Sequence, residues 1–166
     1  SEMCIRDSFD IAENLIPQLY RDYPNIVWAG RSNTILAGQS LGGVTALMAA
    51  IYASTTFGTI ISHSPSMWWN PDQGSPILFT ENDISWVSEQ ILSAPPKDVN
   101  IQLGVGSLEG TTVSHVQRLH QSLIAAGLES NLTVYAGGHD YAWWRGAIID
   151  ALANYNCRKI SDNNFV

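Results

Sequence analysis

Two spacings of apolar residues alternate along the 166-residue chain. Short apolar runs rich in β-branched residues predict buried strands, at residues 34–39, 59–63, 100–105 and 132–135. Longer segments, in which apolar residues recur every three or four positions, predict helices at residues 9–20, 43–54, 83–92, 113–126 and 144–155. Strands that alternate with helices of this length predict an α/β fold, with a mostly parallel sheet and crossover helices.

The long polar segment at residues 64–80 interrupts this alternation. It holds three prolines and the pair Trp68-Trp69, and we expect a loop there. The chain is long enough for one ordinary domain, and no internal repeat divides it.

Composition and charge exclude several classes of function. A formal net charge of −7 argues against nucleic-acid binding, which needs clustered lysine and arginine. No apolar run is long enough to cross a membrane, so we expect no membrane partner. The two cysteines, Cys4 and Cys157, form no disulfide framework and lack metal-ligand spacing, which favours a reducing, cytoplasmic setting without a metal or other cofactor.

The pentapeptide GQSLG at residues 38–42 fits the G-x-S-x-G pattern of a nucleophile elbow. It lies between a predicted strand and a predicted helix, where a sharp turn requires small residues two before and two after the serine. Ser40 would then stand exposed at a helix N-terminus. The Leu41 amide would point to where an oxyanion forms, and the helix dipole would add to its effect.

A serine nucleophile needs a base, and the base needs an acid that orients it. His139 follows the last predicted strand, and the carboxyl ends of parallel strands share one edge, so we expect His139 rather than His63 to be the base. Glu109 follows the penultimate strand and is the expected acid, with Asp140 as its rival. A solvated turn residue remains the alternative for Glu109.

At "AGQSLGG", "SHSPSMWW" and "GGHDYAWWRGAIIDAL" the chain resembles the enterochelin (enterobactin) esterases, within a broader esterase group of the α/β-hydrolases. The resemblance runs over residues 9–155. It implies hydrolysis of the cyclic trilactone of a catecholate siderophore, which releases iron in the cytoplasm. It also implies that Ser40 is the nucleophile and His139 the base. Some relatives manage with this dyad, which leaves the role of Glu109 open.

Four residues near the motifs are candidates for contact with such a small-molecule ester. Gln39 precedes the nucleophile, and either Trp68 or Trp69 offers an aromatic face to a catechol ring, although packing against the sheet is the alternative for both. Arg145 opens the last predicted helix, where it could pair with an anionic ligand or with a nearby carboxylate.

The ends of the chain divide it into three expected segments. Residues 1–8, "SEMCIRDS", resemble the translation of a sequencing adapter, and such a segment is left out of fold reasoning. We expect residues 9–160 to be a partial esterase domain, the C-terminal half of an α/β-hydrolase fold, and residues 161–166 to be a frayed tail. Family members carry earlier strands and a second oxyanion donor upstream, so we expect an N-terminally truncated fragment.

Two further functions fit the same residues. One is a general carboxylic or carbohydrate acyl esterase on the same framework. The other is a non-catalytic binding domain, or an inactive fragment, that keeps the pocket without the chemistry.

Overall fold

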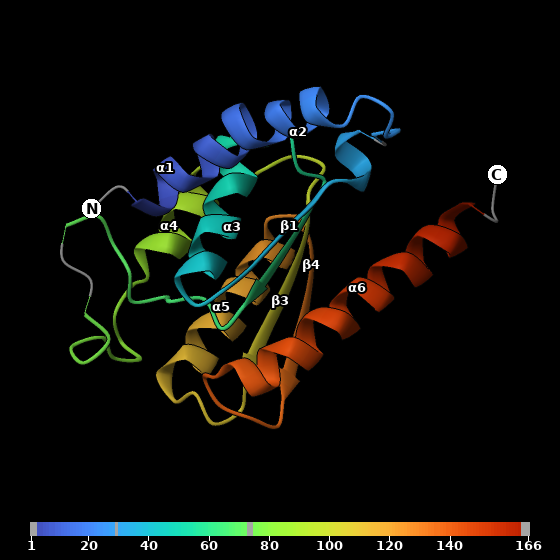
Figure 1. The fold of residues 1–166 in the computed structure, drawn as a ribbon. Coiled ribbons are helices and arrows are strands. Elements are labelled where there is room, and N and C mark those ends of the chain that lie inside the picture. Colours follow the sequence, from blue (N-terminus) through green and yellow to red (C-terminus); the bar gives the residue numbers. More distant parts are fainter. Residues whose placement is uncertain (1–2, 29, 73–74, 164–166) are drawn as a thin grey trace.

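The computed structural model describes residues 3–28, 30–72 and 75–163, and a four-stranded parallel sheet forms its centre (Figure 1). The strands are β1 (Ile35–Gln39), β2 (Thr59–His63), β3 (Asn100–Gly106) and β4 (Glu129–Tyr135), in the order β1-β2-β3-β4. The register places Gln39 beside His63, and His63 beside Gly104. The carboxyl ends of the strands therefore lie at one edge of the sheet, as the sequence predicted.

Three crossover helices cover one face of the sheet. They are α3 (Leu41–Tyr52), α4 (Trp86–Ser93) and α5 (Thr111–Ala125), and α4 lies between the other two and contacts both. Because each strand pairs with the next one along the chain, right-handed crossovers put all three helices on the same side. The last helix, α6 (Tyr141–Asn163), contacts β2 and β3 from the other side, and its C-terminal half runs away from the body of the protein (Figure 1).

The N-terminal helical segment adds a further layer outside α3. It consists of α1 (Met3–Asp10), the π-helical turn η1 (Ile11–Leu15) and α2 (Ile16–Asp22). Pro17 lies in the first turn of α2, and a proline at this point disrupts a regular α-helix, because it lacks an N–H and its ring crowds the preceding turn. The wider π turn directly before it is where the helix accommodates this defect.

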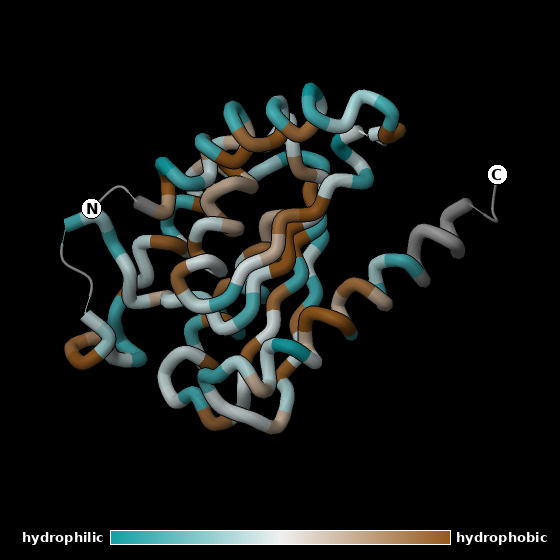
Figure 2. The backbone as a smooth tube through the Cα atoms, viewed as in Figure 1, coloured by the Kyte–Doolittle hydropathy of each residue, from teal (hydrophilic) through white to brown (hydrophobic). Residues whose placement is uncertain are grey.

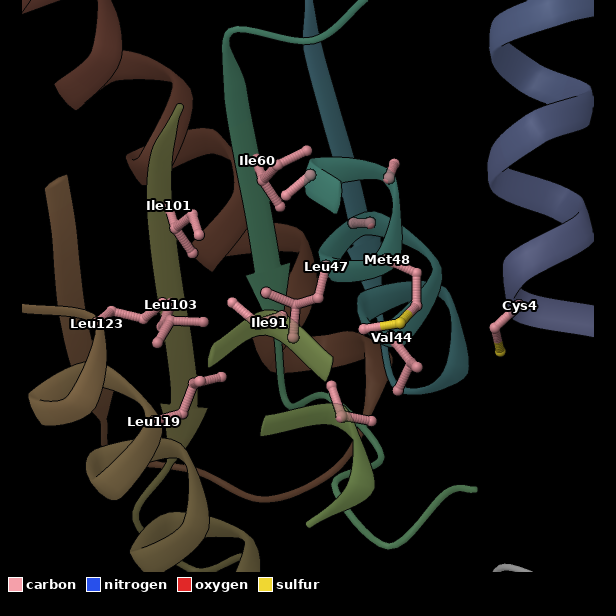
Figure 3. Packing of buried hydrophobic residues seen from close by; sticks show 14 of the residues in the cluster. Cys4, Val44, Leu47, Met48, Ile60, Ile91, Ile101, Leu103, Leu119 and Leu123 are labelled. Atoms are coloured by element: carbon pink, nitrogen blue, oxygen red, sulfur yellow. The ribbon is translucent and has the colours of Figure 1, made fainter. Parts of the chain in front are cut away.

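Helix α1 includes residues that the sequence analysis set aside. Cys4 is 2% exposed, and Figure 3 shows it on the side of α1 that faces α3. Its Sγ approaches the Leu41 carbonyl oxygen at 3.8 Å. The adapter interpretation concerns the origin of residues 1–8 and stays a prediction.

The hydrophobic core fills the space between the sheet and its crossover helices (Figures 2 and 3). Its largest members include Leu47, Ile60, Ile91 and Leu119, each at most 1% exposed. Burial of one such side chain contributes about 1.5–3 kcal/mol. Residues 43–50 of α3 are all buried because α1 covers the side of α3 that the sheet leaves free, so this helix is apolar all round.

Several element boundaries differ from the sequence prediction. Strand β4 begins at Glu129 rather than at 132, because its first polar residues pair with the start of β3 and this edge strand needs no apolar side chains there. Helix α6 begins three residues earlier than predicted, at Tyr141, and continues to Asn163. The predicted frayed tail at 161–166 is thus helical through residue 163, and its last three residues lie outside the described part.

Candidate active site

Ser40 occupies a sharp turn between β1 and α3. Its φ of 55° and ψ of −122° are rare for a residue with a side chain, and strain of this kind marks functional turns. A Cβ atom at Gly38 would overlap the Gly42 carbonyl, so the turn requires glycine there. A Cβ atom at Gly42 would meet no described atom within 4 Å. The prediction that position 42 must also be small for steric reasons is therefore wrong, because its Cβ would point into open space.

The amide of Leu41 is the first in α3. The first helical hydrogen bond of this turn runs from the Val44 N–H to the Ser40 carbonyl at 3.2 Å. The N–H groups before Val44 thus lack a partner within the helix, and they carry the positive end of its dipole. This placement suits an oxyanion donor, and the role of Leu41 stays a prediction.

The structure brings His139 and Glu109 to Ser40. His139 Nε2 lies 3.0 Å from Ser40 Oγ, and His139 Nδ1 lies 2.7 Å from Glu109 Oε2. The Glu109 side chain is 1% exposed, whereas that of His139 is 45% exposed. The rival acid, Asp140, instead accepts a hydrogen bond from the Ala142 N–H at 2.8 Å, in the first turn of α6. The geometry thus favours Glu109 as the partner of His139.

The other histidines lie outside this cluster. His63 is 4% exposed, burial lowers its pKa, and its Nδ1 has no hydrogen-bond partner within the described part of the chain. His115 and His120 lie on α5, where their rings bond to the Thr80 carbonyl and to the Ser130 hydroxyl. The side chains of these three histidines form no hydrogen bond to Ser40 or to Glu109 in the described part of the chain, although the His63 backbone carbonyl accepts one from the Ser40 N–H at 3.1 Å.

Ser64, which the sequence analysis did not single out, contacts Glu109 directly. It directly follows β2, is fully buried, and has a φ of 47°. Its Oγ lies 2.6 Å from Glu109 Oε1, 2.9 Å from the Tyr135 hydroxyl and 2.9 Å from Trp144 Nε1. The Trp144 ring in turn packs edge-on against His139, with a centroid distance of 4.8 Å.

A second serine after the same strand, Ser66, approaches the nucleophile. The two hydroxyl oxygens of Ser66 and Ser40 are 3.2 Å apart, and the Ser66 N–H donates to the Ser40 carbonyl at 3.1 Å. The position of Ser66 in the sequence was a signal that could have identified it. Polar residues that follow β2 lie at the same edge of the sheet as Ser40, because β2 is the neighbour of β1.

The tryptophans proposed for substrate contact differ in exposure. Trp69 is 9% exposed and packs edge-on against Trp86 with a centroid distance of 5.2 Å, as a packing residue would. Trp68 is only partly buried, and with Phe79 and Trp86 it lines a depression of about 220 Å³. Of the pair, Trp68 is the one with a surface available to a ligand.

The two remaining candidates are Arg145 and Gln39. Arg145 is exposed in the first turns of α6, and it forms no ion pair with any residue that the structure describes. Gln39 is partly buried at the end of β1, directly before the nucleophile. Their expected contacts with substrate stay predictions.

A cavity of about 940 Å³ lies at the opposite, amino-terminal edge of the strands. Its wall includes Arg31, Lys97, Asn100, Glu129 and Tyr155. It is thus separate from Ser40 and His139. Across the described residues, no three His, Cys, Asp or Glu side chains are arranged to hold a metal ion, and no helix is long and apolar enough to cross a membrane.

The turn at Ser40, the Glu109 carboxylate after the penultimate strand and His139 after the last strand have the chain order and geometry of the α/β-hydrolase class. Within this class the chain belongs to the family described as "Putative esterase", whose model matches residues 9–155.

The curated relatives share a common description. The chain is 62% identical over 144 residues to an iron(III) salmochelin esterase of Escherichia coli O6:H1, a match that covers 86% of the chain and 35% of that protein. It is 32% identical over 147 residues to an iron(III) enterobactin esterase of Dickeya dadantii, covering 84% of the chain and 33% of that protein. The chain thus spans about a third of the length of these relatives.

Solved structures match the fold. A crystal structure of the enterobactin esterase from Shigella flexneri, in the presence of 2,3-di-hydroxy-N-benzoyl-serine, matches with a TM-score of 0.73 and 26% identity, over 89% of this chain and 37% of that one. A ferulic acid esterase shares the fold with a TM-score of 0.68, at 20% identity, over 87% of this chain and 58% of that one.

Proposed function

We propose that the chain carries the catalytic centre of a serine ester hydrolase. The observation that supports this most directly is the unbroken line of hydrogen bonds from Ser40 Oγ through His139 to Glu109, with heavy-atom distances of 3.0 Å and 2.7 Å. An ionised carboxylate only accepts hydrogen bonds, so the proton of neutral His139 resides on Nδ1. Nε2 is then left with a lone pair that faces the serine hydroxyl.

The mechanism follows from this tautomer. His139 Nε2 takes the Ser40 proton while Oγ attacks the ester carbonyl, and the Leu41 amide stabilises the oxyanion. The C–O bond of the ester then breaks, the leaving alcohol takes the proton from His139, and Ser40 remains acylated. A water molecule that gives its proton to His139 attacks the acyl group, which releases the acid and regenerates Ser40.

For the substrate we propose the ester bonds of a catecholate siderophore trilactone, with the whole protein working in the cytoplasm. The similarity to an iron(III) salmochelin esterase and to iron(III) enterobactin esterases supports this choice. The partly buried ring of Trp68 offers a face for a catechol, and the exposed Arg145 offers a cation for an anionic ferric complex. Gln39 completes the set of proposed substrate contacts, and Trp68 rather than the buried Trp69 is the tryptophan in it.

The test uses the full-length protein, because the chain spans about a third of its relatives. Hydrolysis of the iron-free and ferric trilactone is followed by chromatography of the linear products, and a fluorophosphonate probe reports the reactivity of Ser40. We expect Ser40→Ala to abolish both signals, while Ser93→Ala, which changes an exposed serine in α4, retains them.

Three results would contradict parts of the proposal. Undiminished hydrolysis by Ser40→Ala would refute the nucleophile. A clear preference for small acetyl or feruloyl esters over the trilactone would refute the substrate class. A folded protein that neither hydrolyses esters nor reacts with the probe would point to the binding-domain alternative.

A further inference from the structure

Ser64 has a strained backbone, and its hydroxyl group forms three hydrogen bonds. Its N–H donates to the Gly104 carbonyl at 2.7 Å, which ties the residue to the end of β3 while its φ is 47°. Glycine adopts this φ without cost, whereas a serine is strained there. The side chain therefore has to contribute something that a glycine cannot.

The direction of each hydrogen bond at Ser64 follows from its partners. The Glu109 carboxylate only accepts and the Trp144 indole N–H only donates, so the Ser64 hydroxyl donates to Glu109 Oε1 and accepts from Trp144. Because the one proton of the Ser64 hydroxyl goes to Glu109, the Tyr135 hydroxyl is the donor in its hydrogen bond to the second lone pair of Ser64. The hydroxyl of Ser64 thus uses its one proton and both lone pairs.

These bonds fix the carboxylate that faces the base. Glu109 Oε1 receives the Ser64 hydroxyl at 2.6 Å and the Gly106 N–H at 2.7 Å, which leaves Oε2 for His139. Trp144, held by the same hydroxyl, packs its ring against the His139 ring. Ser64 therefore contacts two of the side chains that contact the imidazole, Glu109 and Trp144.

We propose that Ser64 is a positioning residue, whose hydroxyl holds Glu109 and Trp144 so that His139 Nε2 stays aligned with Ser40. This inference rests on the proposed function, because alignment matters only if His139 acts as the base. The hydroxyl of Ser64 bonds to Glu109, Tyr135 and Trp144 rather than to Ser40 or His139, so Ser64 acts on the base only through these neighbours.

The test compares Ser64→Ala with Ser64→Gly in the full-length protein. Both variants remove the hydroxyl, but only glycine relieves the strain at a φ of 47°. We expect both to lower kcat on a chromogenic aryl ester by about 10- to 100-fold, the range of a lost hydrogen bond to a charged group, with KM changed by less than about twofold. The rate of fluorophosphonate labelling falls in parallel, although Ser64→Gly unfolds at higher urea concentration than Ser64→Ala.

Ser62→Ala is the matched control. Ser62 lies on β2, two residues before Ser64, is equally buried, and donates one hydrogen bond, to the Gly43 carbonyl at 2.9 Å. We expect it to lose stability while kcat stays within about threefold of wild type. If activity follows stability across the variants, so that Ser64→Gly recovers the activity that Ser64→Ala loses, the hydroxyl has no positioning role.

The proposed function and this inference fail separately. Wild-type kcat in both Ser64 variants, with Ser40→Ala inactive, overturns the inference alone. Undiminished hydrolysis by Ser40→Ala overturns the proposed function, and the inference with it.

Discussion

Replacement of Glu109 by glutamine exchanges one carboxylate oxygen for an NH₂ group in a fully buried side chain. The remaining side-chain oxygen can still accept the hydrogen bonds from Ser64 and from the Gly106 N–H, so the amide nitrogen takes the place of Oε2 beside His139. The shape of the site is kept. The charge is removed, and a donor now faces the Nδ1–H of the imidazole.

Two contributions set the size of the expected effect. Opposite unit charges about 4 Å apart attract by about 1 kcal/mol in water and about 4 kcal/mol at an effective dielectric constant near 20. His139 is 45% exposed and Glu109 is buried, so the attraction lies between these two limits. Removal of the charge should therefore destabilise the imidazolium by about 2 kcal/mol, which lowers kcat about 30-fold. The clash of two donors favours the tautomer that protonates Nε2, which costs a further 1–3 kcal/mol or so. Together they predict a fall in kcat of about 10³-fold.

The assay measures kcat and KM of the full-length variant on a chromogenic ester, with circular dichroism to confirm folding. Asp140→Asn is the matched control, because it also neutralises one carboxylate near His139, yet its oxygen can still accept from the Ala142 N–H. We expect this control to stay within about fivefold of wild type. If Glu109→Gln retained most of its turnover, or if Asp140→Asn lost more, Glu109 would not be the acid that supports His139.

Two further predictions concern the fold around the site. Gly38→Ala should prevent the turn at Ser40 and yield little folded protein, because the methyl group added at 38 meets backbone. Gly42→Ala should fold with a urea midpoint near that of wild type, because the methyl group added at 42 does not. Equal folding of the two variants would contradict this prediction. Burial lowers the pKa of His63 below 6.5, so the unfolded chain takes up a proton that the folded chain excludes, and the free energy of unfolding should fall as the pH drops below 6.5. His63→Asn should reduce that fall between about pH 7.5 and about pH 5 in urea titrations, and an unchanged slope would count against it.

The layout of the sheet followed from short-range patterns. Apolar β-branched runs such as 59–63 are long enough to predict a strand, and their alternation with helices predicts parallel pairing and a shared carboxyl edge. This edge is why Ser40, Glu109 and His139 could be grouped although they lie as far as 99 positions apart in the chain. The start of β4 was not predicted, because Glu129 is polar and gives no apolar strand signal. It belongs to the strand because it pairs with Asn100 at the start of β3.

The network at Ser64 required information that composition and spacing do not carry. Its existence depends on φ at one residue and on rotamers of side chains from β4 and α6, and neither has a local sequence signal. For the same reason the sequence pattern predicts a small residue at both 38 and 42. The direction of the Cβ vector decides the requirement, and of these two vectors only the one at 38 points at backbone.

The carboxyl ends of β1 and β2 share one backbone feature, a serine at positive φ directly after the strand. Each strand leads into a buried or partly buried serine at positive φ, 55° at Ser40 and 47° at Ser64, and among the described non-glycine residues only Asp98 has this property as well. The backbone beyond each serine separates their roles. Ser40 directly precedes helix α3, whose free N–H groups favour a developing negative charge. Ser64 instead precedes Pro65, which offers no N–H, and the Ser64 hydroxyl donates to the Glu109 side chain. The strained turns at two adjacent strand ends thus direct the Ser40 hydroxyl to His139 and the Ser64 hydroxyl to Glu109, and the imidazole lies between Ser40 and Glu109.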